Sequence, residues 1–109
     1  MIVPPKLFGS EPRSKLLVAL ALLGETFPSE LARVIGSSLI TTQRILRDLE
    51  RESIVASRQV GRNRMVSLNP RMYGAAELVA LLEKYARRTD VVERIEQIRR
   101  RPRRPGKEF

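Results

Sequence analysis

The sequence predicts a mainly α-helical domain with a single β-hairpin. Apolar residues recur at helical spacing in five segments. Between the third and fourth of these, β-branched residues alternate on both sides of a Gly-Arg-Asn turn, which is typical of a hairpin. The 109 residues, of which 42% are hydrophobic, suffice for one modest core.

The first two helices are bounded by start and stop signals, and the second is short. Residues 1–9 are expected to form an extended N-terminal arm. Ser10 is the predicted N-cap of the first helix, which Gly24 ends. The second helix is expected to begin near Pro28 and to end at Gly36.

The third helix is predicted over residues 39–52, capped by Ser37 or Ser38. The hairpin covers residues 54–68. Two C-terminal helices follow, one over residues 74–88 and one from about residue 90 to 100. We therefore divide the chain into four parts: the arm (1–9), a helix-and-hairpin domain (10–70), the C-terminal helices (74–100) and a basic tail (101–109).

The composition limits the classes of function that the chain can have. The formal charge is +9, and residues 99–109 hold six basic residues against one acid, which favours a polyanionic partner without separating nucleic acid from an anionic membrane. The chain has no cysteine and no histidine, so thiolate metal sites and histidine-based catalysis are excluded, and we expect no enzyme, metal or cofactor. Without a signal-like N-terminus or a long apolar run, the expected location is cytoplasmic, with no membrane contact.

The third helix has an unusual polar face, because no acid occurs between Leu31 and Arg47. At 100° per residue its outward side carries hydroxyl, guanidinium and alkyl groups, which are the groups that read base edges in the major groove. A short helix, a tight turn and such a helix form a helix-turn-helix pattern. The predicted core face holds Leu39, Thr42, Leu46 and Leu49, with Ile45 at its edge.

The stretch ELARVIGSSLITTQRILRDLERESIVASRQVGRNRMVSLNP resembles the winged helix-turn-helix of ArsR-like transcriptional regulators. The resemblance implies a homodimer that binds double-stranded DNA, with helix 39–52 in the major groove and hairpin 54–68 as the wing. The sequence departs from the usual pattern of this family in three ways. Ser53 occupies a common glycine position, Thr42 replaces an apolar residue, and no residues match the Cys and His ligands of metal-sensing members, so metal response is not carried over.

The predicted function is a sequence-specific DNA-binding transcriptional regulator. The expected DNA contacts of the recognition helix are Ser38, Ile40, Thr41, Gln43, Arg44 and Arg47. The wing is expected to contact the backbone or minor groove through Arg58, Arg62, Asn63 and Arg64. The apolar arc of the fourth helix is wider than one packing face requires, so a dimer interface is expected at Leu78, Leu81, Leu82, Tyr85, Val91 and Ile95.

Each feature also has a simpler interpretation. The third helix is then an ordinary surface helix, the wing arginines and the tail promote solubility, and helix 74–88 only covers its own core. The main alternative function is a winged-helix module that binds another protein and uses its basic surface little. Salt-dependent binding to DNA separates the two functions.

Overall fold

A computed structural model describes residues 8–87 and 90–100, apart from the side chains of residues 99 and 100. The elements, in chain order, are α1 (Glu11–Leu23), α2 (Pro28–Ile35), α3 (Leu39–Arg51), β1 (Val55–Val60), β2 (Asn63–Leu68), α4 (Ala75–Ala86) and α5 (Val91–Arg100). The predicted fold class, mainly helical with a two-stranded hairpin, is confirmed. The predictions for the basic tail and most of the N-terminal arm fall outside the described residues.

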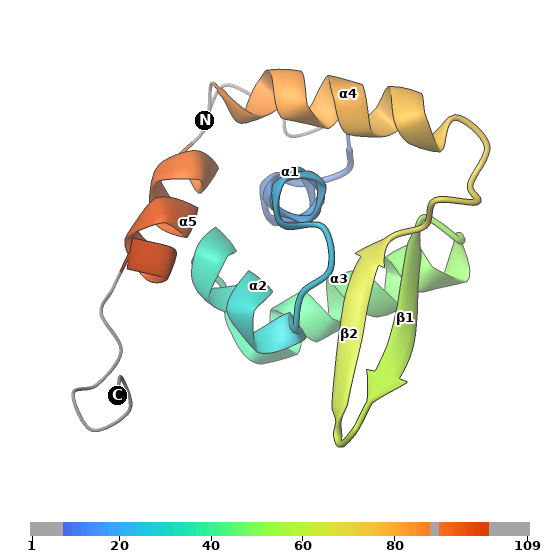
Figure 1. Ribbon diagram of the computed structural model, residues 1–109, viewed down its shortest axis with the longest axis horizontal. Coiled ribbons are helices and arrows are strands. Elements are labelled where there is room, and N and C mark those ends of the chain that lie inside the picture. The colour runs from blue at the N-terminus through green and yellow to red at the C-terminus, as the bar shows by residue number, and fades with distance from the viewer. Residues whose placement is uncertain (1–7, 88–89, 101–109) are drawn as a thin grey trace.

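Helix α1 lies at the centre of the molecule (Figure 1). Helix α4 crosses it on one side, α2 and α3 lie on the other, and α5 and the hairpin flank opposite ends of this arrangement. One hydrophobic cluster joins all these elements, and its fully buried members include Leu16, Leu31, Leu46, Val66 and Leu82. The C-terminal helices therefore complete the same core as the helix-turn-helix.

The turn between α2 and α3 is tight because Gly36 adopts a left-handed conformation, with φ of 69°. Its backbone N–H donates to the last carbonyls of α2, and the N–H of Ser37 donates to Ala32 at 3.0 Å. Ser38 is the N-cap of α3, since its hydroxyl oxygen accepts from the backbone N–H of Thr41 at 3.1 Å. The sequence left Ser37 and Ser38 as alternatives, and the structure selects Ser38.

The hairpin is antiparallel, with Val55 opposite Leu68 and Val60 opposite Asn63. A third backbone segment joins it, because Thr26 exchanges two hydrogen bonds of 2.9 and 2.8 Å with Val66 of β2. The base of the wing is thus tied to the segment between α1 and α2.

Ser53, which links α3 to the hairpin, has a φ of 62°. This is the left-handed conformation that glycine adopts at little cost. Its carbonyl accepts a 2.9 Å hydrogen bond from the side chain of Asn69. Ser53 therefore adopts the left-handed conformation in which a glycine is usual, so the departure from glycine does not change the turn.

The predicted dimer surface is wrong at two positions. Leu82 of α4 and Val91 of α5 are both 0% exposed, because they pack into the core around α1. Leu81, by contrast, is 40% exposed, and Leu78, Tyr85 and Ile95 are half-buried. Within the described ranges, no helix is both long and apolar enough to span a bilayer.

Candidate nucleic-acid interface

The part of α3 from Ile40 to Arg47 presents a basic and apolar surface to solvent. Ile40 is 69% exposed, and Arg44 and Arg47 are also exposed. On the opposite side Leu46 and Leu49 are fully buried, as the helical spacing predicts. Among the residues that the structure describes, Arg44 and Arg47 form no side-chain hydrogen bond or ion pair. Their guanidinium groups keep all their donors available.

Leu39 does not lie on the core face, contrary to the prediction. Its side chain is 44% exposed, because the first turn of α3 extends past the core and faces the wing. Thr42 does pack inward, with 0% exposure, and its hydroxyl donates to the carbonyl of Ser38 at 2.8 Å. This hydrogen bond explains how a polar residue is accommodated where an apolar one is usual.

Two predicted DNA contacts already have intramolecular roles. The hydroxyl of Ser38 caps α3, and it also donates to the hydroxyl of Thr41 at 3.0 Å. These side chains lie at the exposed start of the helix, but their hydrogen-bonding capacity is partly used there. Gln43 is half-buried and lies on the side of α3 that faces the wing.

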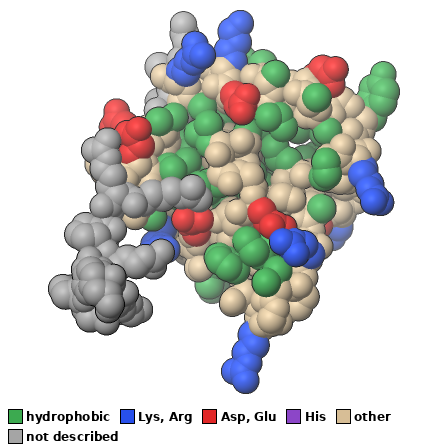
Figure 2. Space-filling view, in the orientation of Figure 1, with side chains coloured by type: hydrophobic (Ala, Val, Ile, Leu, Met, Phe, Trp, Pro, Cys, Tyr) green, Lys and Arg blue, Asp and Glu red, His purple; other side chains and the backbone are tan. Residues whose placement is uncertain are grey.

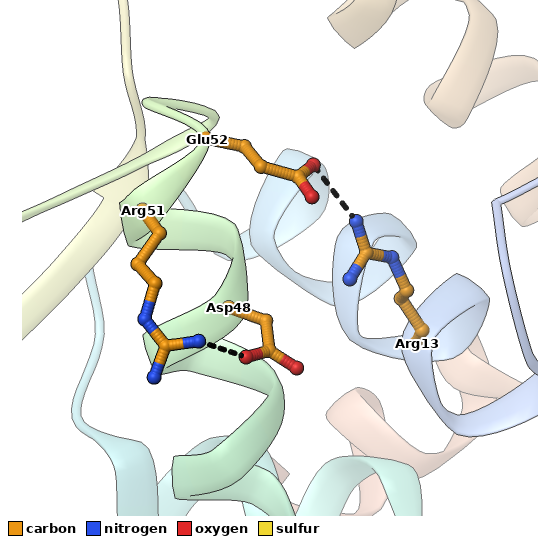
Figure 3. A network of polar contacts seen from close by, with 4 residues as sticks. All are labelled: Arg13, Asp48, Arg51 and Glu52. Carbon is orange, nitrogen blue, oxygen red and sulfur yellow. Dashed lines mark hydrogen bonds and ion pairs between the residues drawn. The ribbon is translucent and has the colours of Figure 1, made fainter.

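The C-terminal end of α3, from Asp48 onward, is electrically balanced. Asp48 pairs with Arg51 at 3.0 Å, and Glu52, just past the helix end, pairs with Arg13 of α1 at 3.2 Å (Figure 3). Together with Glu50, these acids neutralise the last turns of the helix. The unbalanced positive charge of α3 therefore lies before Asp48, at Arg44 and Arg47.

In the wing, Arg58 of β1 is bound by an acid from a distant part of the chain. Its Nε and Nη2 donate to the two carboxylate oxygens of Glu25, at 2.5 and 2.7 Å. The hydrogen bond from Arg58 lowers the pKa of Glu25 below its ordinary value of 4.5, and the carboxylate raises the pKa of Arg58 in return. Arg58 must therefore leave Glu25, or share its donors, in order to bind a phosphate.

Arg64 of β2 is similarly engaged, by Glu50 of α3. Its Nη2 donates to Oε1 of Glu50, while Oε2 of the same carboxylate accepts a 2.8 Å hydrogen bond from the hydroxyl of Ser57. The side chains of Arg64 and Glu50 are 34% and 28% exposed. The contact of Arg64 with DNA stays a prediction, and in the structure without DNA its guanidinium is held by Glu50.

The tip of the wing is different, because Arg62 and Asn63 are exposed at the hairpin turn. In the described part of the chain, neither forms a side-chain hydrogen bond or ion pair. A basic side chain projects beyond the body at the tip of the hairpin, whereas acidic and basic side chains lie next to each other above it (Figure 2). Of the four predicted wing contacts, the two at the tip keep their polar groups available.

A groove of about 360 Å³ separates α3 from the wing. Both of its charged lining residues are arginines, and the carboxylate of Glu50 is not part of the lining. We call this hollow the helix–wing groove; its lining residues are Phe27, Pro28, Ser29, Leu39, Gln43, Arg62, Asn63 and Arg64.

A second hollow, of about 820 Å³, lies between α2 and α5. Arg94 of α5 reaches across its edge and donates to the carbonyl of Arg33 at 3.4 Å, which links α5 to the end of α2. No cluster of three or more His, Cys, Asp or Glu side chains that could hold a metal ion occurs in residues 8–87 and 90–98.

Sequence reasoning missed the acids that neutralise the wing. Glu25 and Glu50 lie 33 and 14 residues from their arginine partners, so no local pattern reveals the pairs.

Comparison with known proteins supports the fold. No family model matches the chain, and no curated protein matches it. A solved structure of a MarR family transcriptional regulator from Silicibacter pomeroyi aligns with a TM-score of 0.58 and 19% identity, covering 81% of this chain and 60% of that one. BpsR of Bordetella bronchiseptica, described through the regulation of its DNA binding by 6-hydroxynicotinic acid, aligns with a TM-score of 0.59 and 18% identity, covering 94% and 74%.

A third structure is Lactococcus lactis ZitR in complex with DNA, with a TM-score of 0.59 and 13% identity, covering 83% of this chain and 60% of that one. This chain thus spans less than two thirds of the Silicibacter and Lactococcus proteins. At such identities the likeness concerns the fold alone: the chain has the winged-helix architecture of these three structures.

Proposed function

We propose that this chain is a sequence-specific DNA-binding transcriptional regulator. The observation that carries the proposal is the outward side of α3 between Ile40 and Arg47, where the side chains of Ile40, Arg44 and Arg47 are exposed and no acid occurs. Guanidinium groups bind guanine edges and alkyl groups contact the thymine methyl, so this surface suits a major groove. The exposed tip of the wing, Arg62 and Asn63, would contact the backbone or the minor groove.

The neighbouring structures agree with this proposal, since one is described as a transcriptional regulator, another through the regulation of its DNA binding, and a third was solved with DNA. They support the broad class of winged-helix regulators and not the finer ArsR-like family, which remains a proposal from the sequence. A cytoplasmic location and an absence of metal or cofactor are part of the same proposal.

The test is a mobility-shift titration against a mixed pool of duplexes, repeated in rising salt. When a protein neutralises DNA phosphates, the logarithm of its binding constant falls linearly with the logarithm of the salt concentration. The slope is about −0.9 for each phosphate contacted. We expect such a slope, and selective retention of a subset of sequences. Absence of binding even at low salt would contradict the proposal and favour the protein-binding alternative.

We also propose that the chain forms a dimer, through a surface that differs from the one predicted from the sequence. Leu81 is exposed on α4, and Tyr73, which precedes this helix, is fully exposed, so both are available to a second copy. A two-fold pair would place two recognition helices about one DNA turn apart, roughly 34 Å, on a pseudo-palindromic site.

Sedimentation of the Leu81→Glu variant tests the dimer. The charge should shift the protein toward monomer while leaving the melting temperature nearly unchanged, because Leu81 is not a core residue. Leu82→Glu is the contrasting variant, since it buries a charge beside α1 and should unfold the chain. A wild-type protein that sediments as a monomer at tens of micromolar (roughly where a specific dimer should hold) would contradict the dimer.

A further inference from the structure

Glu50, in the last turn of α3, holds both strands of the wing. One carboxylate oxygen accepts from Arg64 of β2, and the other accepts from Ser57 of β1 at 2.8 Å. Both ends of the ion pair are about one third exposed or less, so water and salt compete with it less than with a fully exposed pair. The carboxylate therefore connects three elements: the recognition helix and the two strands that follow it.

The same contact borders the helix–wing groove. Arg64 lines that groove, opposite Gln43 and Leu39 of α3. When a helix enters the major groove and a wing reaches the adjacent backbone or minor groove, a sugar–phosphate strand must pass between them. Arg62 in the lining, with Ser29 and Asn63 as neutral donors, suits a phosphodiester strand, while Arg64 forms part of the wall with its charge paired to Glu50.

We propose that Glu50 is a positioning residue, which sets the distance between the recognition helix and the wing so that one sugar–phosphate strand fits the helix–wing groove. This inference rests on the proposed DNA-binding function and extends it. Arg64 then contributes to DNA binding mainly through its bond to Glu50, and the independent phosphate contact of the wing is Arg62.

The inference predicts a change in DNA affinity opposite in direction to the change expected from charge alone. A carboxylate near DNA repels phosphates, so removing its charge ordinarily tightens binding. If Glu50 positions the wing, removing its charge weakens binding, because the wing is no longer held at the distance that the strand requires. The direction of the change in affinity therefore distinguishes the two roles.

The experiment compares Glu50→Gln with Glu52→Gln. Glu52 lies at the same end of α3 and pairs with Arg13 of α1, so its variant removes the same charge without touching the wing. We expect Glu50→Gln to weaken binding to the preferred duplex by roughly three- to tenfold. Glu52→Gln should leave the affinity unchanged or slightly tighter. Arg64→Gln should match Glu50→Gln, and the double variant should be no worse than either single change.

Equal tightening by Glu50→Gln and Glu52→Gln would overturn the inference, since Glu50 would then act only as a repelling charge. Additive losses in the double variant, with a shallower salt slope for Arg64→Gln, would also overturn it and return Arg64 to the phosphate contacts. Thermal melting of each variant verifies that it is folded before binding is compared.

Amide hydrogen exchange of the protein without DNA provides an independent measurement. Exchange in β1 and β2 should be at least about threefold faster in Glu50→Gln than in Glu52→Gln, because only the first variant releases the wing. Equal exchange in the two variants would overturn the inference. If wild type fails to bind any duplex, the proposed function fails, but the exchange measurement still decides whether Glu50 holds the wing.

Discussion

The outward side of α3 and the wing both carry arginines, yet they differ in how much of that charge is available. Arg44 and Arg47 stand without a partner among the described residues, whereas Arg58 and Arg64 are bound to Glu25 and Glu50. The difference shows that a run of basic residues in a sequence is not yet a basic surface. In this molecule the helix supplies available cations, and the wing supplies them only at its tip.

The largest effect is expected at Arg44. Arg44→Ala should cost about 1–3 kcal/mol of binding free energy on the preferred duplex and relax the preference at one base pair, because a bidentate contact to a base is lost. Arg51→Ala is the matched control, since Arg51 is already paired with Asp48 on the same helix. Competition titrations with single-base variants of the site measure both effects. An equal loss on all sequences would make Arg44 a phosphate contact.

The turn that joins the two regions allows a test of what positions the wing. Ser53→Gly should raise the free energy of unfolding by about 0.5–1 kcal/mol, because glycine adopts a φ of 62° without the strain of a Cβ. If ion pairs and not the turn hold the wing, DNA affinity should stay the same. Urea unfolding measures the stability. A loss of affinity in the stabilised variant would show that the strained turn sets the position of the wing.

A smaller effect is expected at the tip of the wing. Arg62→Gln should reduce the salt slope of DNA binding by roughly 0.9, which corresponds to one phosphate contact, without changing sequence preference. Arg71→Gln, an exposed arginine beyond the hairpin, serves as the control and should leave the slope unchanged. Should both variants alter the slope equally, the wing tip would have no special role.

The smallest effect concerns pH. The pKa of Glu25 is below 4.5 in the folded chain, so its bond to Arg58 stabilises the fold at pH values above 4.5 and is lost as pH falls through the folded pKa. The difference in melting temperature between wild type and Arg58→Gln should therefore be present near neutral pH and shrink in acid. The titration midpoint of Glu25, followed by NMR, should rise toward 4.5 in Arg58→Gln. A midpoint that does not move would contradict the pairing.

Local patterns predict much of this fold. Helical spacing, the Ser10 and Ser38 caps and the Gly36 turn depend on residues within one or two turns of each other, so the sequence is enough to recognise them. The inward side of α3 follows from the same periodicity, with the exception of Leu39. That residue is exposed because the core ends before the first turn of the helix, which the spacing alone does not reveal.

The candidate site was predictable only in part, because its electrostatics depend on tertiary contacts. The exposed residues of α3 could be predicted from one helix, but the partners of Arg58 and Arg64 come from other elements. The dimer surface shows the same limit, since Leu81 and Leu82 are neighbours in an apolar stripe and only the packing of α4 on α1 separates them. Periodicity identifies the apolar face of a helix, whereas the assembled core determines which of its residues are buried and which stay exposed.

The most direct measurement is an NMR titration of arginine side-chain signals with the preferred duplex. Our account predicts that the Nε–Hε signals of Arg44, Arg47 and Arg62 shift strongly, because these groups exchange water for DNA. The signals of Arg58 and Arg64 should shift little, since they remain bound to Glu25 and Glu50. Strong shifts at Arg58 and Arg64, with little change at Arg44, would contradict the account and make the wing the principal contact.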